Sequence, residues 1–305
     1  MIDIVKRRYL YFSLSLLVII PGLIALIIWG LPLAIDFTGG SLLYIRFNSG
    51  SLPQSQDIND VYSEFGFADT LVQTSGDDSL FIRSKDMDEA TRSMIIQTME
   101  NRFNTTIIVE SFETVGPLIG KEIALRAAGA VGLAALGILF YITYAFRGVK
   151  NAFRYGVSAI IAMLHDVLVV IGIEAILGHF LGWEVDAIFL TALLTIIGFS
   201  VHDTIVVFDR IRENSRLYRR LPFETIVNQS IVQTLARSIN TQLTVLFTLL
   251  ALAIFGGITI RHFVITLIVG VLSGTYSSIF NAAPILVVWE KREWQYWFRR
   301  STTRA

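Results

Sequence analysis

Two ionisable residues stand inside apolar stretches, with types and spacing that could move a proton. Asp203 falls within the apolar run 187–208, and Arg237 lies well inside a helical stretch that starts near Pro222. An ionisable side chain inside a membrane span costs about 2.5–3.5 kcal/mol, so both should face protein or water. We expect the two side chains to lie at similar depth and to offset each other's burial cost. The same pair also fits a static ion pair that only pins two helices together.

Polar residues around this pair follow helical spacing. Arg237 shares one face of its predicted helix with Thr241, Thr244 and Thr248. A second group clusters on one side of the earlier helix: Thr195, Gly198, Phe199, His202 and Asp203. The two faces would suit a hydrated path, with His202 and Thr241 as candidate relay groups. His202 also fits a simple hydrogen bond to a neighbouring helix, which is the interpretation that we favour.

A third carboxylate, Asp166, follows His165 inside the apolar run 155–181. Asp166 fits a second relay carboxylate, an ion pair with Arg154, or a cap on loop groups near the membrane surface. Glu174 and His179 approach the opposite end of this run, where polar side chains are commoner, so we expect structural or interfacial roles for them.

Several classes of chemistry are missing from the sequence. The chain has no Cys and only 4 His, and it shows no phosphate-binding loop, zinc motif or Ser-His-Asp pattern. Asp166 and Asp203 lack the context of an intramembrane aspartyl protease. We therefore expect no enzyme activity, no catalytic residues, no cofactor and no metal site. A net charge of +0 predicts no nucleic-acid partner.

The elements that position these residues are apolar runs long enough to cross a membrane, which takes about 20 residues. The 305-residue chain is 53% hydrophobic and only 16% charged. Its long apolar runs are 9–30, 127–146, 155–181, 187–208, 238–260 and 263–289. The first is longer than a signal-peptide core and no cleavage-like site follows it, so we expect a retained helix. The sequence predicts six membrane helices in a lipid bilayer.

The basic residues indicate the orientation, because positive residues in short loops mark the cytoplasmic side. If the runs alternate, 16 of the 25 basic residues share that side: Lys6, Arg7, Arg8, Arg147, Lys150, Arg154, Arg210, Arg212, Arg216, Arg219, Arg220, Lys291, Arg292, Arg299, Arg300 and Arg304. Both termini are then cytoplasmic. The long segment after the first run faces outward, towards the periplasm in a Gram-negative cell.

That outer segment, residues 36–121, has the composition of a soluble domain, with 13 acidic and 6 basic residues. It contains a predicted strand–helix–strand–strand–helix–strand order typical of a ferredoxin-like α+β domain. The expected elements are 41–48, 54–65, 68–75, 79–84, 88–103 and 105–115, with a turn at Gly76-Asp77-Asp78. The predicted domains are 1–35 (cytoplasmic N-terminus and first helix), 36–121, 122–290 (five further helices) and 291–305 (basic cytoplasmic tail).

Small residues are frequent in the second and last membrane runs. They include Gly129, Gly132, Gly137, Gly270, Ser273, Gly274, Ser277 and Ser278. Such residues let helices approach closely, and we interpret them as packing residues.

Four short motifs resemble those of the SecD/SecF family of Sec protein-export membrane proteins, within the resistance-nodulation-division (RND) superfamily. They are Asp36-Phe37-Thr38-Gly39-Gly40, Val115-Gly116-Pro117 with Gly120, the run 198–214 (GFSVHDTIVVFDRIREN), and Gly274-Thr275-Tyr276-Ser277-Ser278. The resemblance covers nearly the whole chain. Within the family, the chain is most similar to the SecF members. The chain departs from the family pattern at Phe199 and His202, where Tyr and Asn are usual, and a titratable ring then stands beside Asp203.

The resemblance implies an RND-like half of six helices that uses the proton-motive force, with SecD, to assist protein export across the inner membrane. Asp203 and Arg237 match the family's proton-translocating pair. Implied partners are SecD, the SecYEG translocon, YajC-like and YidC-like accessory proteins, and unfolded preproteins. Asp36, Gly39, Gly40, Gly116 and Pro117 would join the outer domain to the helices as hinges, or as plain tight turns.

Two other functions remain open at the sequence level. One is a non-transporting assembly or insertion scaffold, in which the buried charges are structural. The other is an RND-type pump for small molecules, although the outer domain is small for a pump. The sequence leaves the coupling ion, H⁺ or Na⁺, undecided.

Overall fold

The computed structural model describes residues 3–48, 52–75, 78–149, 151–293 and 295. The chain divides into two compact units. A helical unit comprises Met1–Leu31, Ala130–Trp183 and Ile188–Ala305, and a sheet unit comprises Pro32–Gly129 with Glu184–Ala187. Lys150, Gly76, Asp77 and most of the predicted tail 291–305 lie outside the described residues.

The sheet unit is built on a four-stranded antiparallel sheet with the order β2-β3-β1-β4. Its elements are β1 (Gly40–Phe47), α3 (Ser55–Glu64), β2 (Leu71–Ser75), β3 (Ser79–Ser84), α4 (Glu89–Phe103) and β4 (Ile107–Val115). The two outer strands are reached through α3 and α4, which is the split βαβ arrangement. The predicted ferredoxin-like α+β fold is confirmed, with shifts of up to three residues at element ends.

Alternation along the central strands builds the core of this unit. Leu43, Ile45 and Phe47 of β1 point to one face, where they pack with residues of both helices. Ile95 and Met99 of α4 are fully buried there, whereas Met94, one position earlier, is half exposed. Asp88 caps α4 by accepting the Thr91 backbone N–H at 2.8 Å. Hydrogen bonds from Thr91 lower the pKa of Asp88.

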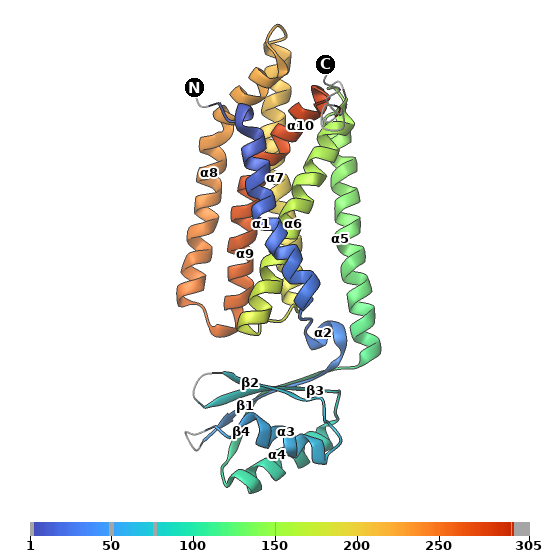
Figure 1. The fold of residues 1–305 in the computed structure, drawn as a ribbon, viewed down its shortest axis with the longest axis vertical. Helices are drawn as coiled ribbons and strands as arrows, with labels where there is room; N and C mark the ends of the chain where they lie inside the picture. The colour runs from blue at the N-terminus through green and yellow to red at the C-terminus, as the bar shows by residue number, and fades with distance from the viewer. Residues whose placement is uncertain (1–2, 49–51, 76–77, 150, 294, 296–305) are drawn as a thin grey trace, which may run out of the picture. The chain divides into compact units, whose positions relative to one another are not determined.

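The helical unit carries the membrane spans. Six helices are long and apolar enough to cross a membrane, within the described residues, and they confirm the predicted bundle. They are α1 (Arg8–Trp29, after the short η1, Val5–Arg7), α5 (Pro117–Ala145), α6 (Ala152–Leu181), α7 (Ala187–Leu217), α8 (Phe223–Phe255) and the continuous stretch α9 (Ile258–Ser277), η2 (Ser278–Ala282) and α10 (Ala283–Glu290). Figure 1 shows α1, α6 and α9 running side by side.

Glycines set how closely these helices approach. A Cβ added at Gly22 of α1 would lie 2.7 Å from the Cα of Gly172 in α6. A Cβ added at Gly274 of α9 would lie 3.2 Å from the Cα of Ser200 in α7. Packing therefore explains Gly270 and Gly274, as expected. Gly129, Gly132 and Gly137 of α5, in contrast, meet nothing within 4 Å.

The last span changes its helical pitch at Ser278–Ala282, a π-helical segment, before continuing as α10. Pro284, the second residue of α10, has no backbone N–H to donate to the preceding turn. Single π-turns are frequent at functional sites, because they turn side chains out of the regular register. Here the segment begins at Ser278, whose hydroxyl faces α7.

Candidate functional site

Asp203 is buried in α7 and 2% exposed. Its Oδ2 accepts a hydrogen bond from Nε2 of Gln242 on α8 at 2.5 Å. The Nδ1 atom of His202 lies 3.7 Å from Oδ1 of Asp203, on a side chain that is 66% exposed. The buried carboxylate thus has a neutral amide as its close partner and an exposed imidazole beside it.

The expected pairing of Asp203 with Arg237 is absent: among the described residues, the Arg237 guanidinium makes no ion pair. Helix geometry gives the reason. Arg237 and Gln242 are five residues apart, which turns their side chains about 140° from each other around α8. Gln242 faces Asp203, whereas Arg237 is exposed on the same side as Thr241, Thr244 and Thr248. These four polar residues do share one face of α8, as expected, but that face is exposed.

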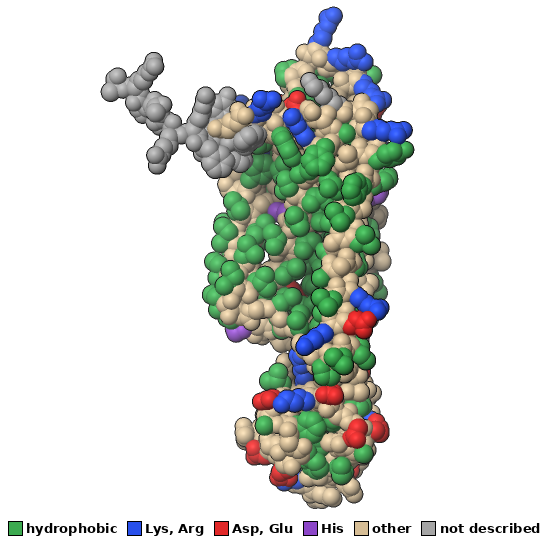
Figure 2. Space-filling view, turned by 90° about the vertical axis from the view of Figure 1, so that its right-hand side faces the viewer, with side chains coloured by type: hydrophobic (Ala, Val, Ile, Leu, Met, Phe, Trp, Pro, Cys, Tyr) green, Lys and Arg blue, Asp and Glu red, His purple; other side chains and the backbone are tan. Residues whose placement is uncertain are grey.

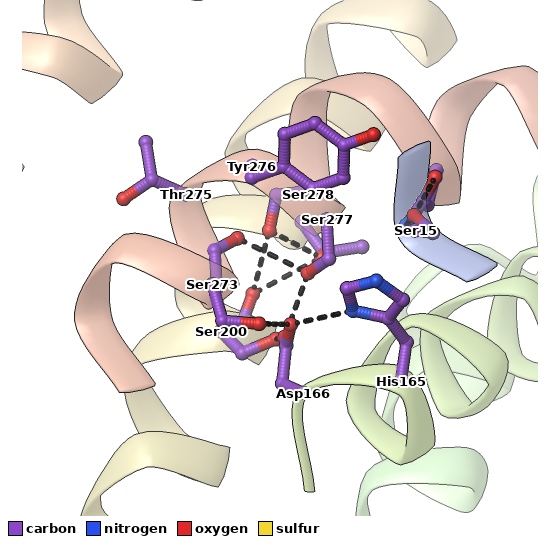
Figure 3. Close-up of polar contacts among 12 residues, drawn as sticks. Ser15, His165, Asp166, Ser200, Ser273, Thr275, Tyr276, Ser277 and Ser278 are labelled. Atoms are coloured by element: carbon purple, nitrogen blue, oxygen red, sulfur yellow. Dashed lines mark hydrogen bonds and ion pairs between the residues drawn. The ribbon is translucent and has the colours of Figure 1, made fainter. Parts of the chain in front are cut away.

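Asp166 of α6 occupies a separate, fully buried polar cluster and is 1% exposed (Figure 3). Its Oδ2 accepts the hydroxyls of Ser200 and Ser277, each at 2.6 Å. Its Oδ1 accepts the hydroxyl of Ser273 at 2.6 Å and lies 3.0 Å from Nδ1 of His165. A carboxylate has about four lone-pair sites, and here three hydroxyl donors from two helices and the His165 ring surround them.

The alternative pairing of Asp166 with Arg154 is not present. Arg154 binds Glu290 instead, at 2.5 Å, near the start of α6. Asp166 lies three turns further into the helix and faces α7 and α9. The structure therefore places it in a network that links three spans, away from the loops.

A chain of hydroxyls leads from this cluster towards Asp203. The backbone carbonyl of Ser200 accepts the hydroxyls of Thr204 and Ser278, both at 3.0 Å. The Thr204 and Ser278 hydroxyls lie 2.9 Å apart. Thr204 directly follows Asp203 on α7. Buried hydroxyls thus continue from one carboxylate to the residue beside the other.

Sequence reasoning missed the residues that complete both carboxylate sites. We interpreted Ser273, Ser277 and Ser278 as packing residues, and Gln242 was not singled out. A signal was present, since Ser273 and Ser277 are spaced i, i+4 on one face of an apolar helix. Thr275 and Tyr276 of the same motif point away from Asp166 (Figure 3).

Glu174 and His179 fall at the other end of α6. Glu174 is 2% exposed, and Nε2 of His262 lies 2.6 Å from its Oε1. The ring of His179 stacks on Trp29 with centroids 4.1 Å apart. Both residues thus make contacts that join helices, which agrees with the structural roles we expected.

The glycine motifs at residues 36–40 and 115–120 pack against each other in the sheet unit. Gly39 has φ +75°, and a Cβ there would lie 2.7 Å from the Cα of Pro117. Gly40 has φ +129°, and a Cβ there would lie 2.6 Å from the Ser84 carbonyl. Gly40 also pairs with Val115 in the sheet. Close approach and positive φ both require glycine at these two positions.

Asp36 connects this motif to the start of α7. Its Oδ2 accepts the backbone N–H of Ala187, the first residue of α7, at 2.8 Å. Arg83 of β3 pairs with Glu184 at 2.8 Å and donates to Thr38 at 2.7 Å. The four-residue segment Glu184–Ala187 is therefore held within the sheet unit.

Among the described residues, no three His, Asp or Glu side chains gather closely enough to hold a metal ion. The arrangement can hold or pass protons, since it consists of buried carboxylates, hydroxyls and imidazoles.

Comparisons with known proteins identify a family. A family model described as "Protein export membrane protein SecD/SecF, C-terminal" matches residues 95–292. The chain is 58% identical to protein translocase subunit SecF of Anaerolinea thermophila, over 100% of the chain and 99% of the relative. It is 50% identical to the SecF subunit of Thermobaculum terrenum, with the same coverage.

Solved structures agree. The chain superposes on SecDF, a translocon-associated membrane protein from Thermus thermophilus, with a TM-score of 0.81 and 33% identity. A second structure, of SecDF in a super-membrane-facing form, gives a TM-score of 0.68 and 31% identity. The chain covers 39% of each of these longer proteins.

Proposed function

Because this chain belongs to the SecF subunits of the SecD/SecF protein-export family, we propose that it works with a SecD partner to couple proton entry to protein export. It is a multi-pass protein of the cytoplasmic membrane. The observation that carries the coupling proposal is the buried Asp203 carboxylate, whose close partner is a neutral amide rather than a cation.

Gln242 suits a carboxylate that changes its protonation state. Its Nε2 donates to the ionised form of Asp203, as described above. Its Oε1 is buried and has no hydrogen-bond partner among the described residues, so it could accept the proton of the neutral form. Reorientation of this amide would satisfy either state, so protonation would replace the present hydrogen bond between α7 and α8 with one of the opposite direction.

Arg237 supports a SecD partner. An exposed guanidinium and a threonine stripe on a membrane helix are costly against lipid tails. A second set of membrane helices with polar residues at the interface would bury these side chains. The chain covers only 39% of the SecDF structure that it resembles, so SecDF contains additional chain that is absent here. We propose that this face of α8 meets SecD, and that Arg237 takes part in proton transfer in the assembled complex.

Among the other candidate relay residues, His202 and Thr241 are exposed and Asp166 is buried. His202 is exposed beside Asp203 and suits proton delivery from water. Thr241 also lies on the exposed face of α8. Asp166 is connected to the neighbourhood of Asp203 through Ser200 and Thr204.

A structural change caused by protonation of Asp203 would reach the sheet unit through the start of α7. This helix carries Asp203, and its first residue is bound by Asp36 of the sheet unit. We propose that repacking of α7 is transmitted to the sheet unit through this contact and the Arg83–Glu184 pair. Gly39, Gly40, Gly116 and Pro117 would then serve as the hinge.

The remaining assignments follow from the family relation and the charge pattern. We propose cytoplasmic termini, a periplasmic sheet domain (residues 36–121), and action on unfolded preproteins at SecYEG. YajC-like and YidC-like proteins are further candidate partners.

One observation favours the scaffold alternative. Both oxygens of the Asp166 carboxylate have partners, and these partners join three helices, which suits a structural role. If all buried charges acted in this way, the chain would stabilise the translocon without using the proton gradient.

Asp203→Asn separates the two functions. We expect the variant, reconstituted with SecD and SecYEG in vesicles, to assemble normally and to lose the stimulation of export by a proton gradient. Asp209→Asn is the matched control, because Asp209 lies on the same helix and pairs with Arg212 at the exposed end. Full stimulation in Asp203→Asn would rule out proton coupling through this residue and leave the scaffold.

A further inference from the structure

A cavity of 280 Å³ opens at the arginine-rich end of the helical unit, apart from the buried carboxylates. It lies between the start of α6, the end of α7, the start of α8 and the end of α10. Its lining includes four arginines and one carboxylate: Arg154, Arg212, Arg216, Arg219 and Glu290. Positive charge dominates this cavity.

Two of the four arginines are already neutralised. Arg154 pairs with Glu290 at 2.5 Å. Arg212 pairs with Asp209 and also donates to the Ala145 carbonyl at 3.3 Å. Arg216 and Arg219 have no carboxylate within ion-pairing distance among the described residues. The cavity therefore holds two guanidinium groups that lack a counterion.

Neutral groups add to this anion-binding character. Ser215 lines the cavity, and its hydroxyl oxygen is buried without a hydrogen-bond partner among the described residues. Gly148 leaves room for Arg216, because a Cβ there would lie 3.1 Å from one of its guanidinium nitrogens. A hydroxyl and two guanidinium groups around one space suit the oxygens of a phosphate.

The surroundings of the cavity are apolar and exposed. Phe153 is 57% exposed, Leu217 65% and Tyr218 44%, and all three neighbour lining residues in the chain. Figure 2 shows Lys and Arg side chains gathered at one end of the helical unit, with hydrophobic side chains on the face beside them. Charge next to exposed apolar surface matches an amphiphile rather than a soluble anion.

We propose that this cavity binds the phosphate of an anionic phospholipid, whose acyl chains lie along Phe153 and Leu217. The phosphate oxygens accept hydrogen bonds from Arg216, Arg219 and Ser215. Because the site joins α6, α7, α8 and α10, the bound lipid stabilises the end of the helix that carries Asp203.

The test measures binding of phosphatidylglycerol to the purified full-length chain in detergent, by native mass spectrometry. Phosphatidylcholine and inorganic phosphate are the comparison ligands. In Arg216→Gln/Arg219→Gln we expect phosphatidylglycerol binding to weaken about thirtyfold, which is about 2 kcal/mol at about 1.4 kcal/mol per tenfold, because two charge-assisted hydrogen bonds to the phosphate are lost. Binding of phosphatidylcholine should not change.

Arg220→Gln is the matched control, because Arg220 is exposed beside the site and does not line the cavity. It should bind phosphatidylglycerol within about twofold of the unaltered chain. Gly148→Leu fills the cavity without removing a charge and should also weaken binding. Equal losses in Arg220→Gln, or unaltered binding in both cavity variants, would overturn the site. Displacement of the lipid by millimolar inorganic phosphate would instead assign the cavity to a soluble anion.

Discussion

The two buried aspartates sit in different electrostatic surroundings. Asp166 receives three serine hydroxyls and faces His165, whereas Asp203 receives one amide hydrogen bond. Four partners surround the Asp166 carboxylate and connect it to α7 and α9, whereas Asp203 has one close partner on α8. We therefore propose that Asp203 changes its protonation state and that Asp166 anchors the helices.

Replacing Asp166 tests this division at the residue scale. In Asp166→Asn one oxygen becomes an amide N–H, which faces a serine hydroxyl that must turn to accept it. We expect the free energy of unfolding in detergent to fall by about 1–3 kcal/mol, the typical cost of an unsatisfied buried group. Asp203→Asn, which loses one contact, should fall by less. Thermal unfolding of both variants measures the difference. Equal stability of Asp166→Asn and the unaltered chain would contradict the anchoring role.

His202 shows how one departure from the family pattern is accommodated. Its ring is 66% exposed, so the site has room for it without a repacked core. Nδ1 of the imidazole lies 3.7 Å from Oδ1 of Asp203, so the ring borders the buried carboxylate without covering it.

At the scale of elements, the helices are placed by pairs of small residues. Gly22 and Gly172 bring α1 and α6 into backbone contact, and Gly274 brings α9 against Ser200 of α7. Ser200 at the second contact, and Ser273 and Ser277 on either side of Gly274, all donate to Asp166. Close packing therefore supports the polar cluster directly.

Gly172→Ala tests the α1–α6 contact. The new Cβ would lie 2.7 Å from the Cα of Gly22, and the neighbour is backbone that cannot rotate away. We expect a loss of about 1–3 kcal/mol in the free energy of unfolding, as for other overpacked sites. Gly132→Ala is the control, because its Cβ would meet nothing within 4 Å. Thermal unfolding in detergent measures both, and a neutral Gly172→Ala would show that the helices can separate at little cost.

At the scale of the whole molecule, Arg8 connects the N-terminal part of the helical unit to its C-terminal part. Its guanidinium pairs with Glu224 of α8 at 2.8 Å and with Glu293 beyond α10 at 2.6 Å. Tyr9 also donates to Glu293 at 2.8 Å. Burial alone would raise the pKa of Glu293, but the hydrogen bonds and charge of Arg8, with Tyr9 and Lys291, outweigh burial and lower it.

This lowered pKa predicts a pH-dependent stability. A carboxyl group whose pKa is lower in the folded chain stabilises it above the ordinary value of 4.5, and this contribution is lost as the pH falls through the folded value. We expect Glu293→Gln to unfold at a lower temperature than the unaltered chain at pH 7, by the equivalent of about 1–2 kcal/mol. The difference should shrink below pH 4.5. A difference that persists unchanged at pH 3 would show that packing, rather than charge, is responsible.

The amino-acid sequence by itself determined the membrane class, the six spans, the α+β domain between the first two, and the family. Apolar run length, strand alternation and contiguous motifs are local properties, so they can be read without knowing the fold. Asp203, Arg237 and Asp166 were also found locally, because a charge inside an apolar run stands out.

The partners of those charges were decided only by the tertiary structure. Helical periodicity put Arg237 on a polar face of α8, but it did not say that Gln242, about 140° away around the helix, faces α7. Likewise, Ser200, Ser273 and Ser277 converge on Asp166 from two helices that are far apart in the chain. Which face of a helix meets which neighbour depends on the packing of every other helix, and no local pattern contains that information.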